Sequence, residues 1–163
     1  MASSFSFDIV SDFDQQELRN AIDQASREIS TRYDLKDSKT EIAQEKDQLV
    51  ISTSDEFTLS SVVDVLETRV VRRGLSLKIL DYQTVEDASG GRVRQVVKLR
   101  RGIPEPLAKQ LVKDIRADHK KVTPQIQGDA IRVTSKNKDD LQDVIQSLKG
   151  AEVDVALQFV NYR

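Results

Sequence analysis

The sequence predicts an α+β protein made of two ferredoxin-like domains, each a β-α-β-β-α-β (split βαβ) unit with a four-stranded antiparallel sheet. Three observations lead to this prediction. The last third of the chain echoes the first half, apolar residues alternate with a period of two in the expected strands, and they recur every three or four residues in the expected helices. A repeat of this kind indicates an internal duplication, so the two halves are expected to share one architecture.

The duplication is visible in three pairs of segments. Gln48–Ser54 aligns with Asp129–Ser135, and Lys78–Tyr82 aligns with Gln158–Tyr162. Between them, four apolar residues at helical spacing recur in each half. These are Leu59, Val62, Val63 and Leu66 in the first half, and Leu141, Val144, Ile145 and Leu148 in the second. A strand, a helix and a closing strand therefore recur in the same order.

The first half begins with an alternating strand, in which Phe5, Phe7 and Ile9 face one way. Asp14 and Glu17 have the spacing of a capping box, which predicts the start of an amphipathic helix. The expected elements are a strand over 5–10, a helix over 14–31, a hairpin over 39–45 and 49–53, a helix over 58–73 and a strand over 75–79.

The second half restarts after Asp87–Gly91, which is typical of a hairpin tip or a turn between domains. Pro104 suits the first turn of a helix, and Gly128-Asp129 suits a tight hairpin. The expected elements are a strand over 94–101, a helix over 104–118, a hairpin over 122–127 and 130–135, a helix over 139–149 and a strand over 153–160. The repeat therefore divides the chain into 1–89 and 90–163.

Composition excludes several classes of function. The chain has 163 residues, a net charge of −2, no cysteine and one histidine, His119. A thiolate or paired-histidine metal site is therefore impossible, and we expect no catalytic residues, no metal and no cofactor. The sequence has no apolar run of membrane length and no signal pattern at its start, so we expect a cytoplasmic protein without a membrane partner.

Seven segments of the sequence resemble the YajQ family of small bacterial proteins. They are Ser6–Ser11, Glu17–Ala21, Arg73-Gly74, Val93–Gln95, Ile126–Asp129, Asp139–Gln142 and Leu157–Asn161. The resemblance covers nearly the whole chain. It implies two ferredoxin-like domains that exchange their N-terminal strands, here 4–10 and 94–101. It also implies nucleotide binding without an agreed enzymatic activity, and ligands of the cyclic di-GMP and RNA classes.

Alternation along the strands of the second half predicts a polar sheet face opposite the helices. Arginine suits phosphate because its planar fork donates two hydrogen bonds, and glutamine can bind base edges. The predicted nucleotide-binding residues on this face are Lys98, Arg100, Arg132, Thr134, Gln125 and Gln158. The alternative interpretation is an ordinary solvated sheet face. In the first half, the same alignment places Leu49 and Ile51 on the free face.

A second basic cluster, Arg69, Arg72 and Arg73, lies at the end of a predicted helix. Cations at that position complement the helix dipole, so the cluster has a structural interpretation as well as a ligand-binding one. Lys120, Lys121, Lys136 and Lys138 are interpreted as loop charges.

The function that these observations favour is non-catalytic capture of a phosphorylated nucleotide or cyclic dinucleotide, on a basic sheet face or in a cleft between domains. The expected partners are a nucleotide of the GTP, ATP or cyclic di-GMP class, an RNA such as tRNA, and a regulatory protein. Two alternatives stay open: a chaperone-like protein-interaction adaptor that binds no nucleotide, and an RNA-binding accessory factor. Saturable binding of a mononucleotide or cyclic dinucleotide would separate the first function from the adaptor, and a steep salt dependence with long RNA, but not with nucleotides, would favour the RNA-binding factor.

Overall fold

The computed structural model describes residues 4–163, and the chain forms two compact units. Unit 1 consists of the chain up to Asp12 together with Arg101–Arg163, and unit 2 consists of Phe13–Arg100. The chain therefore crosses between the units twice, after Asp12 and after Arg100. The first three residues of the expected domain 1–89 lie outside the described residues.

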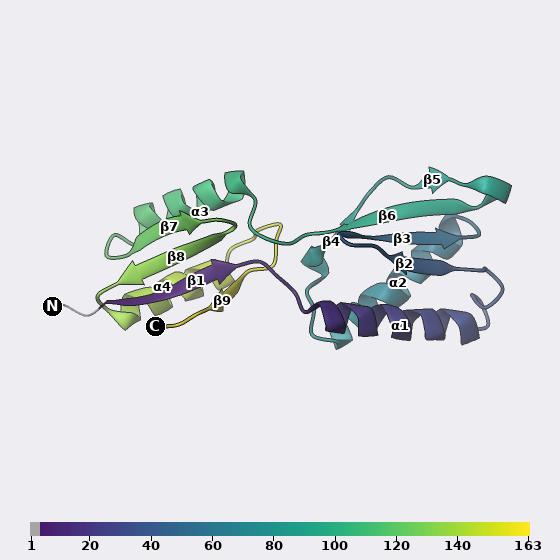
Figure 1. Cartoon of the computed structure of the whole chain (residues 1–163), viewed down its shortest axis with the longest axis horizontal. Helices are drawn as coiled ribbons and strands as arrows, with labels where there is room; N and C mark the ends of the chain where they lie inside the picture. The colour runs from purple at the N-terminus through teal and green to yellow at the C-terminus, as the bar shows by residue number, and fades with distance from the viewer. Residues whose placement is uncertain (1–3) are drawn as a thin grey trace. The chain divides into compact units, whose positions relative to one another are not determined.

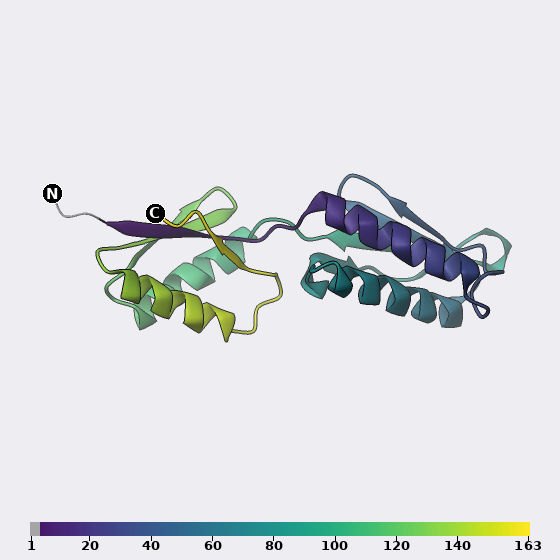
Figure 2. The ribbon, with the colours of Figure 1, turned by 90° about the horizontal axis from the view of Figure 1, so that it is seen from below.

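Unit 1 has the ferredoxin-like order of elements, with unit 2 inserted after its first strand. Its elements are β1 (Phe5–Val10), α3 (Glu105–Asp118), β7 (Thr123–Gln127), β8 (Ala130–Ser135), α4 (Lys138–Lys149) and β9 (Gln158–Val160). The antiparallel sheet has the order β7-β8-β1-β9, so the first strand of the chain is an inner strand (Figure 1). Helices α3 and α4 cover one face of this sheet (Figure 2).

Unit 2 has the same layers in a permuted chain order. Its elements are α1 (Gln15–Thr31), β2 (Glu41–Gln44), β3 (Gln48–Thr53), α2 (Glu56–Arg72), β4 (Leu80–Tyr82), β5 (Glu86–Asp87) and β6 (Val93–Leu99). The sheet has the order β2-β3-β6-β4, and β5 pairs with β6. Strand β6, the last element of the unit, occupies the inner position that β1 occupies in unit 1. The α+β, duplicated ferredoxin-like fold class is thus confirmed.

Local sequence signals explain where three helices begin. The Asp14 side chain accepts hydrogen bonds from the backbone N–H groups of Gln16 and Glu17 at the start of α1. Asn137 caps α4 by accepting from the N–H of Asp139. At the start of α2, Asp55 accepts from the N–H of Thr58. This hydrogen bond lowers the pKa of Asp55, because it favours the ionised carboxylate.

Each unit has its own apolar core between its helices and the covered face of its sheet. In unit 1, Phe7 and Ile9 of β1 are fully buried against side chains of α3, α4 and β8. In unit 2, Leu49 and Ile51 of β3 are fully buried against α1 and α2. The prediction that Leu49 and Ile51 lie on the free face is therefore wrong.

The error is a one-residue slip in the aligned repeat. Both hairpins turn over two residues, so Gln48 after Lys46-Asp47 corresponds to Ala130 after Gly128-Asp129. Leu49 is then equivalent to Ile131 rather than to Ala130. Because side chains alternate between the two faces of a strand, a slip of one residue moves the whole apolar set to the wrong face.

The closing strands also differ from their predicted ranges. Residues 77–79 form a 3₁₀ turn, and strand β4 begins only at Leu80. The last strand is limited to Gln158–Val160, where the prediction had 153–160. Asp87–Gly91 is the tip of the β5–β6 hairpin, as one of the two interpretations proposed, and Gly90 and Gly91 there have positive φ.

Candidate functional site

The open face of the unit 1 sheet brings together four of the predicted site residues. Gln125 of β7 pairs with Arg132 of β8, which pairs with Asp8 of β1. Residues paired across strands share a face, and Gln158 lies on this face because it pairs with Val10. Thr134, two residues along β8 from Arg132, also lies on this open face.

Asp8 is a central member of this face that sequence analysis did not select. Its side chain is largely buried, with 8% of the residue exposed. The Arg132 guanidinium donates to it from Nε to Oδ1 at 3.0 Å and from an Nη to Oδ2 at 3.4 Å, and Asn161 donates to Oδ2 at 2.8 Å. The signal that could have revealed Asp8 is the alternation of Phe7 and Ile9, which places Asp8 on the open face.

The two charges of this pair stabilise one another. The hydrogen bond from Arg132 lowers the pKa of Asp8, and this effect is larger than the opposing effect of burial. The carboxylate in turn raises the pKa of Arg132. Asp8 therefore neutralises part of the charge of Arg132, but it also fixes the orientation of the guanidinium. An arginine side chain has five N–H donors, and the Asp8 carboxylate accepts hydrogen bonds from two nitrogens of Arg132, Nε and one Nη.

Gln158 has a structural contact of its own on this face. Its side-chain oxygen accepts a hydrogen bond from the backbone N–H of Asp12 at 2.8 Å, where the chain leaves unit 1. Because the side-chain oxygen of Gln158 is used in this hydrogen bond, the amide NH₂ group is the part of the Gln158 side chain that can still bind a ligand.

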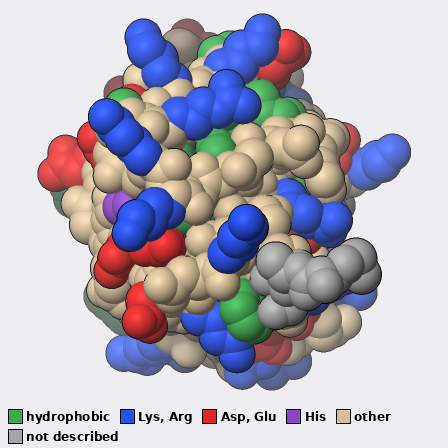
Figure 3. Space-filling view, turned by 90° about the vertical axis from the view of Figure 1, so that its left-hand side faces the viewer, with side chains coloured by type: hydrophobic (Ala, Val, Ile, Leu, Met, Phe, Trp, Pro, Cys, Tyr) green, Lys and Arg blue, Asp and Glu red, His purple; other side chains and the backbone are tan. Residues whose placement is uncertain are grey.

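A hollow lies at the end of the open face where Thr134 is found. Its volume is about 540 Å³, and its lining residues are Ser4, Lys121, Thr123, Thr134, Ser135, Lys136, Asn137 and Asp140. Three hydroxyl residues from the neighbouring strands β7 and β8, two lysines from the adjoining loops and the carboxylate of Asp140 in α4 thus line one space. The interpretation of Lys121 and Lys136 as separate loop charges did not anticipate this arrangement. Figure 3 views the left-hand side of Figure 1, the side of unit 1, where lysine and arginine side chains gather among acidic ones.

Lys98 and Arg100 belong to the other unit. Lys98 lies on the open face of the unit 2 sheet, where its register partners are Gln48 and Asp81. Arg100 follows β6 and forms an ion pair with Asp81 at 3.3 Å. The six predicted site residues are therefore divided between the two units, four in unit 1 and two in unit 2.

The second basic cluster connects the two helices of unit 2. Arg69 forms an ion pair with Glu28 at 2.7 Å, and Arg73 forms one with Glu17 at 3.3 Å. Both acidic partners belong to α1, so these two arginines join α2 to α1. Arg72 is exposed. The structural interpretation of the cluster accounts for Arg69 and Arg73.

Two further searches cover the described part of the chain. Among residues 4–163, no group of three or more histidine, cysteine, aspartate or glutamate side chains is arranged to hold a metal ion. In the same residues, no helix is both long enough and apolar enough to cross a membrane.

The fold and the open faces define a class of protein: a duplicated ferredoxin-like α+β protein with a polar sheet face and an adjoining basic hollow. Comparison with known proteins gives the particular family. Residues 5–163 match the family model described as "Nucleotide-binding protein YajQ-like". The chain belongs to this family.

Curated relatives match over their whole length. A protein of Synechococcus sp. (strain JA-3-3Ab) and one of Acaryochloris marina are each 61% identical to this chain over 163 residues, which is all of both chains. A protein of Thermosynechococcus vestitus is 59% identical over the same length. All three carry the name nucleotide-binding protein.

Proposed function

We propose that this protein binds a nucleotide on the open face of unit 1, as a non-catalytic cytoplasmic binding protein. The phosphates would bind Arg132 and the lysines of the hollow, Lys121 and Lys136, with Thr134 between them. Gln125 would donate to or accept from the base or ribose, and the amide NH₂ of Gln158 would donate to it. The names of the curated relatives support nucleotide binding in general.

The observation that carries this proposal is the orientation of Arg132 by Asp8. A flexible arginine loses conformational freedom when it binds a ligand, and a guanidinium that is already held has less to lose. The Arg132 side chain is 34% exposed, so a ligand can reach it, whereas the Asp8 side chain is only 11% exposed. An oriented arginine two residues along the strand from Thr134, which lines a hollow with hydroxyls and lysines, is suited to phosphate oxygens, because these accept charge-assisted hydrogen bonds.

The size of the hollow agrees with a small ligand. Sites for small molecules and cofactors have volumes of about 300–1,000 Å³, and this hollow has about 540 Å³. It is continuous with the sheet face through Thr134, which lines the hollow and lies two residues from Arg132. A hollow of this volume would accommodate a mononucleotide. A cyclic dinucleotide would extend further along the face towards Gln125.

Calorimetric titration with GTP, ATP, cyclic di-GMP and tRNA tests the proposal. Arg132→Ala should weaken binding of the preferred nucleotide by about tenfold to hundredfold, as expected for loss of a charge-assisted hydrogen bond. Arg132→Lys should recover only part of the affinity, because lysine lacks the planar fork. Arg27→Ala, which removes an exposed arginine from α1 in unit 2, is the matched control and should bind like the parent.

Lys98 and Arg100 are tested separately, because they lie on the unit 2 sheet. The proposal for these two residues fails if Lys98→Ala and Arg100→Ala bind as the parent does. If the triple variant Lys98→Ala, Arg100→Ala, Arg132→Ala stays folded and binds nucleotide with parental affinity, the proposed site is wrong. Binding of tRNA alone, with a steep dependence on salt, would instead favour an RNA-binding factor.

A further inference from the structure

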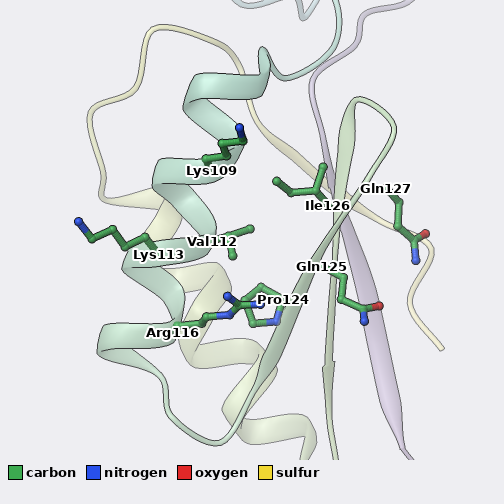
Figure 4. Close-up of a pocket in the computed structure, with 8 residues that line it drawn as sticks. All are labelled: Lys109, Val112, Lys113, Arg116, Pro124, Gln125, Ile126 and Gln127. Atoms are coloured by element: carbon green, nitrogen blue, oxygen red, sulfur yellow. The ribbon is translucent and has the colours of Figure 1, made fainter.

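A second surface of unit 1 is a groove between α3 and β7, with a volume of about 710 Å³. It is lined by Lys109, Val112, Lys113, Arg116, Pro124, Gln125, Ile126 and Gln127. Figure 4 shows that the helix and the strand form its two sides. Because β7 is the outer strand of the sheet, the groove is open along the edge of the unit.

The groove is separate from the open face of the sheet, although the two surfaces share strand β7. Pro124 and Ile126 point towards α3, whereas Gln125 and Gln127 point away from it (Figure 4). Ile126 is 41% exposed, which is unusual for a large apolar side chain on the helix-covered face of a sheet. With Val112 and Pro124, it gives the groove an apolar floor.

Two cations lie at the ends of this floor. Lys109 and Arg116 extend towards β7, while Lys113 points outwards (Figure 4). Lys109 and Arg116 are seven positions apart in the sequence, which is about 10 Å along a helix axis. Lys109 forms an ion pair with Glu105 at 3.0 Å. Both side chains are mostly exposed, and exposed ion pairs contribute little free energy. No ion pair is recorded for Arg116 within residues 4–163.

The edge of β7 is a poor template for an added strand. Pro124 has no backbone N–H to donate, and proline on an edge strand disfavours pairing with another chain. Recognition in the groove therefore has to come from side chains. An apolar strip between two cations spaced two helical turns apart matches a helix that carries acidic residues at the same spacing and apolar residues between them.

We propose that the groove between α3 and β7 binds an acidic amphipathic helix of a partner protein. Apolar side chains of that helix contact Ile126 and Val112, and its carboxylates pair with Lys109 and Arg116. RNA is a less suitable occupant, because a phosphate backbone would leave the apolar floor without a partner. Of the residues named for the proposed nucleotide site, only Gln125 also lines this groove, and the groove proposal does not rest on Gln125.

The probe is a fluorescein-labelled, alanine-based peptide of about 20 residues, long enough to form a helix in water. It carries glutamates seven residues apart and two leucines between them, on one helical face. Fluorescence anisotropy with the full-length protein should show saturable binding. A peptide of identical composition, in which the leucines are moved to the opposite face, should bind at least about fivefold more weakly, since it cannot make both contacts at once.

Two variants assign the binding to the groove. Lys109→Gln with Arg116→Gln should weaken binding about tenfold through loss of two charge pairs. Ile126→Ser should weaken it about threefold to tenfold through loss of apolar contact. The matched control is Lys46→Gln with Lys149→Gln, which removes the same charge from exposed sites elsewhere and should leave the affinity unchanged. Circular dichroism melting checks that every variant is folded.

The proposal is overturned if the folded groove variants bind the peptide as tightly as the parent, or if the peptide does not bind. It is also overturned if a single-stranded uridine oligonucleotide displaces the peptide and binds the Ile126→Ser variant with parental affinity, because the groove would then be an RNA surface. Nucleotide affinity should be the same in the parent and in all groove variants, so this test and that of the nucleotide site can fail separately.

Discussion

In unit 1, the pair at the centre of the open sheet face is Asp8 and Arg132, whereas the equivalent pair in unit 2 is Val96 and Val50. The neighbouring edge strands differ in the same way, with Gln125 in unit 1 and Ala43 in unit 2. The covered faces are mostly apolar in both units, with Thr53 and Gln95 as buried polar residues in unit 2 and Ser135 in unit 1. One backbone architecture thus carries two surfaces, and the polar one is the better candidate for recognising a charged ligand.

This comparison shows which part of a duplicated domain can change while the core stays the same. Replacing an apolar pair on an open face by an ion pair does not affect the core behind it. The ion pair is held by a mostly buried carboxylate, which means that it needs both members: one charge alone would be left without its partner. The predictions below test this contrast between the units, beginning with the largest expected effect.

The first prediction concerns the strand that unit 1 receives from the start of the chain. A fragment of residues 92–163 lacks β1, which is an inner strand of the unit 1 sheet. The circular dichroism spectrum of this fragment should therefore be that of an unfolded chain. A chain in which a short glycine-serine linker replaces 13–100 should fold, because the Ser11 oxygen accepts from the N–H of Gly102 at 2.6 Å and the two ends are therefore adjacent. A cooperative melting transition of the 92–163 fragment would contradict this account.

The second prediction separates the two faces of β3 in unit 2. Ile51→Arg places a charge in the core and should lower the free energy of unfolding by more than about 4 kcal/mol, which would unfold the unit. Ser52→Arg changes the next residue, which lies on the open face, and should lower the free energy of unfolding by less than about 1 kcal/mol. Urea denaturation measures both. Equal effects of the two substitutions would show that the face assignment of this strand is wrong.

The third prediction concerns the Asp8 carboxylate. Asp8→Asn should destabilise the protein by about 1–3 kcal/mol at neutral pH, because it removes the charge that pairs with Arg132. The folded-state pKa of Asp8 is lowered, so its contribution is complete above the unfolded-state pKa of about 3.9 and is lost as the pH falls through the folded-state value. The stability difference between parent and variant should therefore disappear in acid. A difference that is independent of pH would exclude this cause.

The fourth prediction concerns a variant in which the open face of unit 1 carries the apolar pair of unit 2. Asp8→Val with Arg132→Val removes the ion pair and substitutes the apolar pair that Val96 and Val50 form. The unfolding midpoint should stay the same or rise, since the Asp8 carboxylate of this partly buried ion pair is mostly desolvated, and replacing such pairs by apolar residues is often neutral or stabilising. Nucleotide affinity should fall as in Arg132→Ala. Retained binding would show that the pair has a structural role only.

The sequence was sufficient for the fold class because alternation and helical periodicity report burial directly. The strand with Phe5, Phe7 and Ile9 and the helix that begins at Asp14 could both be predicted in this way. The register between the repeats was mispredicted, because aligning Thr53-Ser54 with Thr134-Ser135 placed Ile51 opposite Arg132. The pairing within the two hairpins makes Ile51 equivalent to Val133. The shortness of the last strand also depends on pairing with β1, a segment 150 residues away in the chain.

The candidate site was predictable in part for a similar reason. Arg132, Gln125 and Thr134 follow from alternation along single strands. Asp8 and Arg132 are 124 residues apart, and no local pattern indicates that they form an ion pair. The division of Lys98 from Arg132 between two sheets follows from the exchange of β1 and β6, which only long-range pairing establishes.

The insertion of unit 2 between β1 and α3 has a consequence for synthesis on the ribosome. Unit 2 is one continuous segment and is complete when Arg100 has left the exit tunnel. Strand β1 is made earlier, yet its partner β9 ends at Val160, which is synthesised roughly 3–12 seconds after residue 100 at typical translation rates. During that interval Phe7 and Ile9 have no core to enter. The nascent chain therefore presents a short apolar strand ahead of unit 2, which is the kind of segment that a cellular chaperone protects until the rest of unit 1 has been synthesised.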